Sequence, residues 1–306
     1  MTAEPTQTGG KDRDRLRTVA VRGLQARVSA RPARGRLADE PPLLLCNGIG
    51  TSLEALQPLV DALDPDRGVV RFDVPGVGGS PAPRFPYPIA ALSSWVTALM
   101  ASLGHQQFDV FGLSWGGGLA QQLAVQSPRR VRRLVLVATG TGMLMVPAHP
   151  RVLSKMLTPR RHRDPEYAAR IAPEIYGGSM RTHPEVGAAL MHDQTRAGPN
   201  RGYYYQLVAM TGWSSLPFLR MIRQPTLVMG GDDDPIIPSI NPRMQAQLIP
   251  SARLVLYEGG HLGILTEADE LAPHIDTFLN EQSLNEQSLN EHSLDEPSDR
   301  EENSHE

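Results

Sequence analysis

Short apolar runs alternate with stretches of helical periodicity along most of this chain, and this rhythm constrains the fold more than any other feature. Strands are indicated at 42–46, 69–74, 108–113 and 134–138. Between them, apolar residues recur at three- and four-residue spacings, as over 53–63, which predicts helices. Parallel strands need such long crossover connections, so the order predicts a doubly wound, mostly parallel α/β sheet.

The alternation stops at Thr139 and resumes with a continuous apolar run over 225–229. The residues between show helical patches and no convincing buried strand. We therefore divide the chain into an α/β core formed by 17–138 and 220–279 and a helical lid, or cap, over 139–219. Sheets of this kind bind their ligands beyond the carboxyl ends of the strands, and an insertion at that edge would cover them.

The two ends of the chain differ from the core in composition. Residues 1–16 are polar and charged and lack the apolar segment of a signal peptide. Residues 280–306 contain a repeated Leu-Asn-Glu-Gln-Ser pentapeptide whose later copies are degenerate. They include nine acidic residues and one arginine. Since neither segment has a pattern that could bury a face, we expect both to be disordered.

Composition excludes several classes of function. The arginines are scattered and no recognition motif accompanies them, which argues against nucleic-acid binding. No apolar stretch approaches the length of a membrane span, so a cytoplasmic protein is expected. The single cysteine, Cys46, excludes an intrachain disulfide and gives no sign of a metal site, and we expect no metal or organic cofactor. The oligomeric state is open.

The sequence Gly-Leu-Ser-Trp-Gly over 112–116 carries the chemical argument. It is the only G-x-S-x-G in the chain, and it joins the apolar run 108–113 to a helical pattern that begins near Gly116. This strand–turn–helix context is the one that a nucleophile elbow requires, because the serine must project from a tight turn at the end of the sheet. Small neighbours keep that turn free of clashes. The motif predicts an α/β-hydrolase fold with Ser114 as the nucleophile.

A serine hydroxyl needs a general base and an orienting acid, which follow in the order Ser, Asp, His in this fold. His261 comes directly after the predicted strand 253–257, whereas the later histidines fall in a helix or in the tail. Three consecutive carboxylates, at 232–234, follow the strand 225–229. We choose Asp234 from the spacing to Pro238, and Asp232 and Asp233 remain the alternatives.

The remaining predicted site residues stabilise the oxyanion or contact the substrate. Backbone amides of Trp115, which follows the nucleophile, and of Ile49, in the loop after the first buried strand, are placed to form the oxyanion hole. In the cap, Tyr204 and Trp213 are candidate contacts for an acyl chain, with burial in the cap core as the alternative. The methionines of the same region could likewise contact an acyl chain or lie in the core of the cap.

The chain resembles the intracellular medium-chain-length polyhydroxyalkanoate (PHA) depolymerases of bacteria from about residue 17 to 279. The resemblance includes motifs of the core and, more tellingly, motifs of the cap, because the core motifs are shared by many other esterases. The segments that carry the resemblance are Asn-Gly-Ile-Gly at 47–50, Phe-Asp-Val-Pro-Gly-Val-Gly-Gly-Ser at 72–80, Ser-Trp-Gly-Gly at 114–117, Arg-Ile-Ala-Pro at 170–173, Ile-Tyr-Gly-Gly at 175–178, Gly-Tyr-Tyr at 202–204 and Gly-Asp-Asp-Asp-Pro at 231–235.

This resemblance implies hydrolysis of a storage polyester of 3-hydroxy fatty acids at intracellular granules, with a triad of Ser114, His261 and Asp234. The acidic repeat is not part of the family pattern. The alternatives are a general carboxylesterase or lipase for medium-chain acyl esters and, in another class, a non-catalytic ligand-binding member of the fold. A complete triad argues against the last, since a pure binder does not need all three groups.

Overall fold

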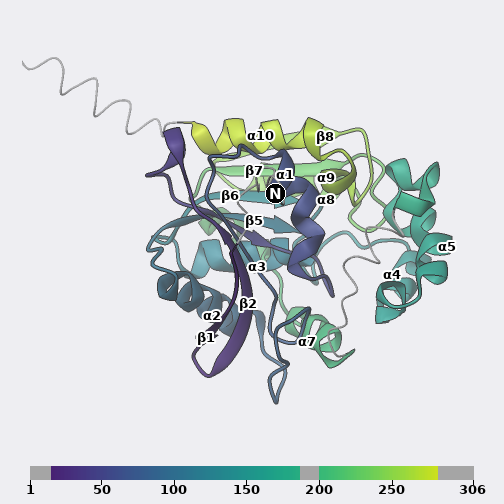
Figure 1. The fold of residues 1–306 in the computed structure, drawn as a ribbon. Coiled ribbons are helices and arrows are strands. Elements are labelled where there is room, and N and C mark those ends of the chain that lie inside the picture. The colour runs from purple at the N-terminus through teal and green to yellow at the C-terminus, as the bar shows by residue number, and fades with distance from the viewer. Residues whose placement is uncertain (1–14, 187–199, 282–306) are drawn as a thin grey trace, which may run out of the picture.

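The computed structural model describes residues 15–186 and 200–281, and within them one mixed sheet organises the molecule (Figure 1). The strand order is β1-β2-β4-β3-β5-β6-β7-β8; β1 and β2 pair in antiparallel fashion, as do β2 and β4, and every other pairing is parallel. The prediction of a mostly parallel α/β sheet is confirmed. The strands are β1 Arg15–Val21, β2 Leu24–Arg31, β3 Leu43–Cys46, β4 Val69–Phe72, β5 Phe108–Leu113, β6 Val131–Val137, β7 Thr226–Gly231 and β8 Ala252–Tyr257.

Helices cover both faces of the sheet, as the continuous apolar strands require. Because side chains alternate along a strand, Leu43 and Leu45 pack in one buried cluster with α1 and α10, whereas Leu44 and Cys46 pack in the other with α2 and α3. The core helices and turns are η1 Gly35–Leu37, η2 Leu53–Leu56, α1 Gln57–Ala62, α2 Ile89–Ser102, α3 Trp115–Gln126, α8 Ile240–Leu248, α9 Gly263–Thr266 and α10 Ala268–Asn280.

The segment between β6 and β7 is helical and lies at one end of the sheet, where Figure 1 shows α4 and α5 apart from the layered core and α7 closer to it. In its described part, β-type pairing is limited to an isolated bridge between Gly142 and Ser214. Its elements are α4 Pro150–Met156, η3 Pro159–His162, α5 Pro165–Tyr176, η4 Gly178–Arg181, α7 Asn200–Met210 and η5 Leu216–Met221.

Glycines let the cap approach the strand-end loops very closely. A Cβ at Gly177 (φ 62°) would lie 1.9 Å from the carbonyl oxygen of Asp233, in the loop after β7. A Cβ at Gly202 would lie 1.7 Å from the carbonyl oxygen of Gly76, in the loop after β4. No side chain fits at either position. The cap is therefore held against the carboxyl ends of the strands, which is the edge that the sequence predicts for a ligand.

The element boundaries differ from the sequence-based ones in small ways. β1 begins at Arg15, so the core starts two residues before the predicted position 17. β6 begins at Val131 rather than at Leu134, because Val131 pairs with Phe108 across an irregular register. The predicted disordered ends fall mainly on residues 1–14 and 282–306, which lie outside the described residues. None of the described helices is long and apolar enough to cross a membrane.

Candidate active site

Ser114 occupies the sharp turn between β5 and α3. Its backbone has φ 53° and ψ −116°, a conformation that costs a non-glycine residue about 1–3 kcal/mol. The surrounding structure holds it there: the Ser114 amide donates to the Val137 carbonyl at 2.9 Å, and Thr139 Oγ1 donates to the Ser114 carbonyl at 2.7 Å. The turn leaves the side chain half-buried at the strand end rather than in the sheet core.

Ser114, His261 and Asp234 form a continuous hydrogen-bonded chain. His261 Nε2 lies 3.0 Å from Ser114 Oγ, and His261 Nδ1 lies 2.8 Å from Asp234 Oδ2. Asp234 is buried, and its second oxygen accepts from the amides of Ile236 and Ile237, at 2.9 Å each. These amides fix the carboxylate, and the carboxylate fixes the imidazole with Nε2 directed at the hydroxyl. This geometry can activate a serine nucleophile.

The cap positions the histidine of this chain. The His261 amide donates to the Tyr176 carbonyl at 2.7 Å, at the end of α5. The phenol ring of Tyr176 lies parallel to the imidazole, with 6.3 Å between ring centroids and 15° between planes. The loop after β8 and the end of α5 therefore behave as one unit at the site.

The loop after β3 offers a free amide beside the serine. Asn47 Oδ1 accepts from the Gly48 amide at 2.8 Å, and the Gly50 amide donates to Gln206 Oε1 at 2.7 Å. The amide of Ile49, between them, has no acceptor in the part of the chain that the structure describes. The Gln206 carbonyl also accepts from the Trp115 indole at 2.8 Å. One buried cap residue thus ties together the two segments predicted to supply the oxyanion hole.

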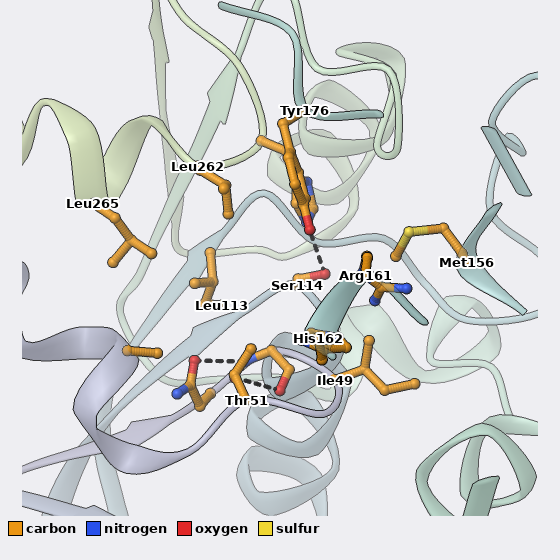
Figure 2. Close-up of a pocket in the computed structure, with 14 residues that line it drawn as sticks. Ile49, Thr51, Leu113, Ser114, Met156, Arg161, His162, Tyr176, Leu262 and Leu265 are labelled. Atoms are coloured by element: carbon orange, nitrogen blue, oxygen red, sulfur yellow. Dashed lines mark hydrogen bonds between the residues drawn. The ribbon is translucent and has the colours of Figure 1, made fainter. Parts of the chain in front are cut away.

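A pocket of about 410 Å³, open solvent at its mouth included, contains Ser114 and His261 (Figure 2). Figure 2 shows Leu113, Leu262 and Leu265 on one side of Ser114, the cap residues Met156 and Arg161 on the other, and His162 below it. One wall is therefore apolar and the other carries buried polar groups. The remaining lining residues are Asn47, Gly48, Ile49, Thr51, Ala55 and Tyr176.

Comparison with known proteins identifies the family of the chain. Residues 41–268 match the family model described as alpha/beta hydrolase fold. The chain belongs to the α/β-hydrolase fold family. It is 47% identical over 268 residues to the poly(3-hydroxyalkanoate) depolymerase of Ectopseudomonas oleovorans, which covers 87% of this chain and 93% of that protein.

Solved structures show the same fold. The enol-lactonase from Burkholderia xenovorans LB400 superposes with a TM-score of 0.74 at 27% identity, covering 87% of this chain and all of that one. A hydrolase from Pseudomonas aeruginosa PA01 superposes with a TM-score of 0.73 at 25% identity, covering 87% of this chain and 98% of that one. The predicted α/β-hydrolase fold is confirmed, as are the resemblance to PHA depolymerases and the prediction of an enzyme of this hydrolase class.

The three aspartates after β7 of this α/β hydrolase have three different partners. Asp234 bonds His261, as described above. Asp233 is half-buried, pairs with Arg181 and accepts from the Gly178 amide at 2.8 Å, so it binds the cap to the core. Asp232 accepts from the Gly259 amide at 3.1 Å and shapes the loop after β8. The partners of the three aspartates thus differ in the structure, whereas the sequence distinguishes these residues only by their spacing to Pro238.

The two aromatic residues predicted to contact substrate lie outside the pocket lining. Trp213 donates through its indole to Gln122 Oε1 at 2.8 Å and packs on Phe218. Tyr204 is 45% exposed on the surface of the cap. The structure does not bring either of them to Ser114, so their contact with substrate stays a prediction.

The cap brings two polar residues that the sequence analysis missed to the pocket. Arg161 and His162 lie in η3, at the end of a basic run that reads as a surface segment. Both are buried, and burial together with the Arg161 guanidinium holds the pKa of His162 well below its usual range. His162 is therefore neutral near pH 7. No cluster of three or more His, Cys, Asp or Glu that could ligate a metal ion occurs among the described residues.

Gly116→Ala is expected to lower the free energy of unfolding by about 1–3 kcal/mol. A Cβ there would lie 2.1 Å from the Cys46 carbonyl oxygen and 2.6 Å from the Asn47 carbonyl oxygen, so α3 or the loop with Ile49 must move. Thermal unfolding and ester hydrolysis measure the two consequences, stability and catalysis.

Gly118→Ala is the matched control for this glycine, two residues further along α3. Its Cβ would meet the flexible end of Met210 rather than backbone, and alanine favours a helix by about 1 kcal/mol over glycine. Equal losses in the two variants would contradict the close-approach argument.

Proposed function

We propose that this protein hydrolyses the ester bonds of medium-chain poly(3-hydroxyalkanoate) through an acyl-enzyme on Ser114. The observation that carries the proposal is the hydrogen-bonded chain from Ser114 through His261 to Asp234, with distances of 3.0 and 2.8 Å. The 47% identity to a poly(3-hydroxyalkanoate) depolymerase supports the choice of substrate. A complete triad also argues against a non-catalytic ligand-binding protein.

The reaction follows from the roles of these groups. Ser114 Oγ attacks the ester carbonyl carbon while His261 Nε2 takes its proton, and Asp234 stabilises the imidazolium that forms. The carbonyl oxygen becomes an oxyanion, for which the amides of Ile49 and Trp115 are the donors. The bond to the alcohol oxygen then breaks, and that oxygen receives the proton from His261.

Water completes the cycle. The oxygen of a water molecule attacks the acyl carbon while His261 takes a proton from that water. The bond from the acyl carbon to Ser114 Oγ then breaks, and the imidazolium returns the proton to Oγ. The products are an alcohol end and a carboxylic acid. Apart from water, every group named in these steps belongs to the chain or to the substrate.

The surface of the cap supports a polymeric substrate. Exposed large apolar side chains concentrate between β6 and β7, and such patches on soluble proteins mark contacts with other apolar surfaces. We propose that this surface faces the polyester granule inside the cell, with Tyr204 among the residues that contact polymer outside the pocket. The exposed large apolar residues described in this segment are Met143, Leu144, Val146, Leu153, Leu157, Val186, Tyr204, Val208 and Met221.

The experiment that tests this function compares a polymer with a soluble ester. Purified wild-type protein is expected to release 3-hydroxy acids from suspended medium-chain poly(3-hydroxyalkanoate) and to hydrolyse p-nitrophenyl octanoate. Titration of released acid and absorbance of p-nitrophenol measure the two rates. Hydrolysis of the soluble ester without release from the polymer would instead assign a general carboxylesterase or lipase, which the pocket at Ser114 would also suit.

A further inference from the structure

One cationic side chain in the pocket has no anionic partner in the described protein. Arg161 is 3% exposed and lines the pocket with Ser114. Its hydrogen-bond partners are neutral: Nη1 donates to the Tyr203 hydroxyl at 2.9 Å and to the Thr158 carbonyl at 3.4 Å, and the Tyr176 hydroxyl is a further partner. Its Nε has no partner at all among the described residues. No described carboxylate forms an ion pair with it, although ion pairs are common elsewhere on this chain.

Such an arrangement is unfavourable for the protein alone. An arginine cannot shed its charge on burial, and a buried charge needs a counter-ion or a full set of hydrogen bonds. The guanidinium is also the group best suited to a carboxylate, which it binds through two parallel N–H donors. An unpaired arginine inside a ligand pocket therefore indicates an anionic group on the ligand.

The neighbour of this arginine adds a second unsatisfied group. His162 is 6% exposed and lines the same pocket, and neither of its ring nitrogens has a partner among the described residues. Its ring packs on Tyr203, with 5.8 Å between centroids. A neutral imidazole provides one donor and one acceptor, which suits a ligand that carries carboxylate oxygens or a hydroxyl.

We propose that Arg161 binds the terminal carboxylate of the polyester chain, with His162 beside it, so that hydrolysis removes units from the carboxyl end. This inference rests on the proposed function. In a 3-hydroxy acid the carboxylate follows the hydroxyl-bearing carbon closely, so the carboxylate of the last unit lies near the last ester oxygen. Figure 2 shows Arg161 on the side of Ser114 opposite Leu262 and Leu265, which places the leaving unit by the cap and the acyl unit by the leucines.

The balance of the step is that of ester hydrolysis. The bond between the carbonyl carbon of the penultimate unit and the 3-oxygen of the terminal unit breaks. That 3-oxygen takes the proton held by His261. The terminal unit leaves as a free 3-hydroxyalkanoate anion. Water supplies the oxygen of the new carboxyl group, which is the end that Arg161 binds in the next round.

The test uses the dimer of 3-hydroxyoctanoate as the free acid and as its methyl ester. Both contain the same internal ester, and only the first contains the anion. Wild-type protein is expected to hydrolyse the internal ester of the free acid with a kcat/KM about 10- to 100-fold higher, the range for a hydrogen bond to a charged group. Arg161→Gln is expected to bring this ratio to about 1, and Arg161→Lys to restore part of it.

Arg160→Gln is the matched control, because Arg160 precedes Arg161 in the same turn but is exposed and paired with Asp164. The ratio should not change in this variant. An equal loss on both dimers in Arg161→Gln would overturn the proposal and leave Arg161 as a structural partner of Tyr203 and Tyr176. A wild-type ratio near 1 would overturn it as well.

A measurement on the wild type alone covers the case of a variant that does not fold. The 3-hydroxyoctanoate anion is expected to inhibit hydrolysis of p-nitrophenyl octanoate about 10-fold more strongly than neutral 3-hydroxyoctanamide. Equal inhibition would contradict the carboxylate site. Polymer hydrolysis without preference for the anion would refute only this site, whereas preference for the anion without polymer hydrolysis would refute only the polymer as substrate.

Discussion

Ser114→Ala is expected to lower kcat for p-nitrophenyl octanoate by at least about 10⁴-fold, as loss of the nucleophile does in other serine hydrolases. The methyl group cannot attack the carbonyl, and His261 loses the hydroxyl that lies 3.0 Å from its Nε2. The turn itself is held by the bond from the Ser114 amide to the Val137 carbonyl and by the bond from the Thr139 hydroxyl to the Ser114 carbonyl, and both remain in the variant. We therefore expect a folded and inactive protein, measured by initial rates and by thermal unfolding of the same sample.

Ser102→Ala is the matched control, because Ser102 is exposed at the end of α2 and its hydroxyl donates to the Leu99 carbonyl of the same helix. It should retain wild-type rates. An organophosphonate should label Ser114 in the wild type and fail to label Ser114→Ala. A wild-type serine that resists labelling would indicate a ligand-binding protein, and undiminished hydrolysis by Ser114→Ala would contradict the catalytic proposal.

Much of this site follows from sequence because its geometry is imposed by parallel strands. The strands before Ser114, Asp234 and His261 are β5, β7 and β8, which run parallel in one sheet. Their carboxyl ends meet at a single edge, so residues directly after them are brought together whatever lies between them in the chain. Periodicity and the position of each residue after a strand were therefore sufficient to predict their proximity.

The cap could not be predicted in the same way, because its residues are placed by long-range contacts that leave no local pattern. The tyrosines of α7 show the difficulty. Neighbouring residues of a helix point about 100° apart, and α7 turns Tyr203 inward, at 3% exposed, and Tyr204 outward, at 45%. The repeated tyrosines do not reveal which one faces the core. That orientation depends on the loop of Gly50, against which Tyr203 packs.

The buried pair Arg161–His162 illustrates the same limit more strongly. A run of basic residues is typical of a solvated surface, and only the tight turn of η3 buries two of them while Arg160 stays exposed. Gln206 likewise reaches the loops of Gly50 and Trp115 from far along the chain. The residues that sequence analysis missed are thus those whose neighbours are distant in sequence and not joined by the sheet.

Asp234→Asn is expected to lower kcat by about 10⁴-fold, the effect of the equivalent change in a well-studied serine protease. The reason is the pair of amides at Ile236 and Ile237, which both donate to one oxygen of residue 234, at 2.9 Å each. In the asparagine variant the remaining oxygen must accept these bonds, so the amide nitrogen faces His261 Nδ1. That nitrogen is a donor, so the imidazole must carry its proton on Nε2, where it cannot accept the proton of Ser114.

The neighbouring aspartates provide controls that differ by one or two positions. Asp232→Asn keeps an oxygen for the Gly259 amide, and Asp233→Asn weakens an exposed ion pair with Arg181, which contributes at most about 1 kcal/mol to stability. Both should keep kcat within about 10-fold of the wild type, while KM for p-nitrophenyl octanoate stays similar in all three variants. Since all three changes remove one negative charge within the same loop, a loss confined to Asp234→Asn would exclude a general electrostatic effect. A comparable loss in Asp232→Asn or Asp233→Asn would mean that another carboxylate orients His261 during turnover.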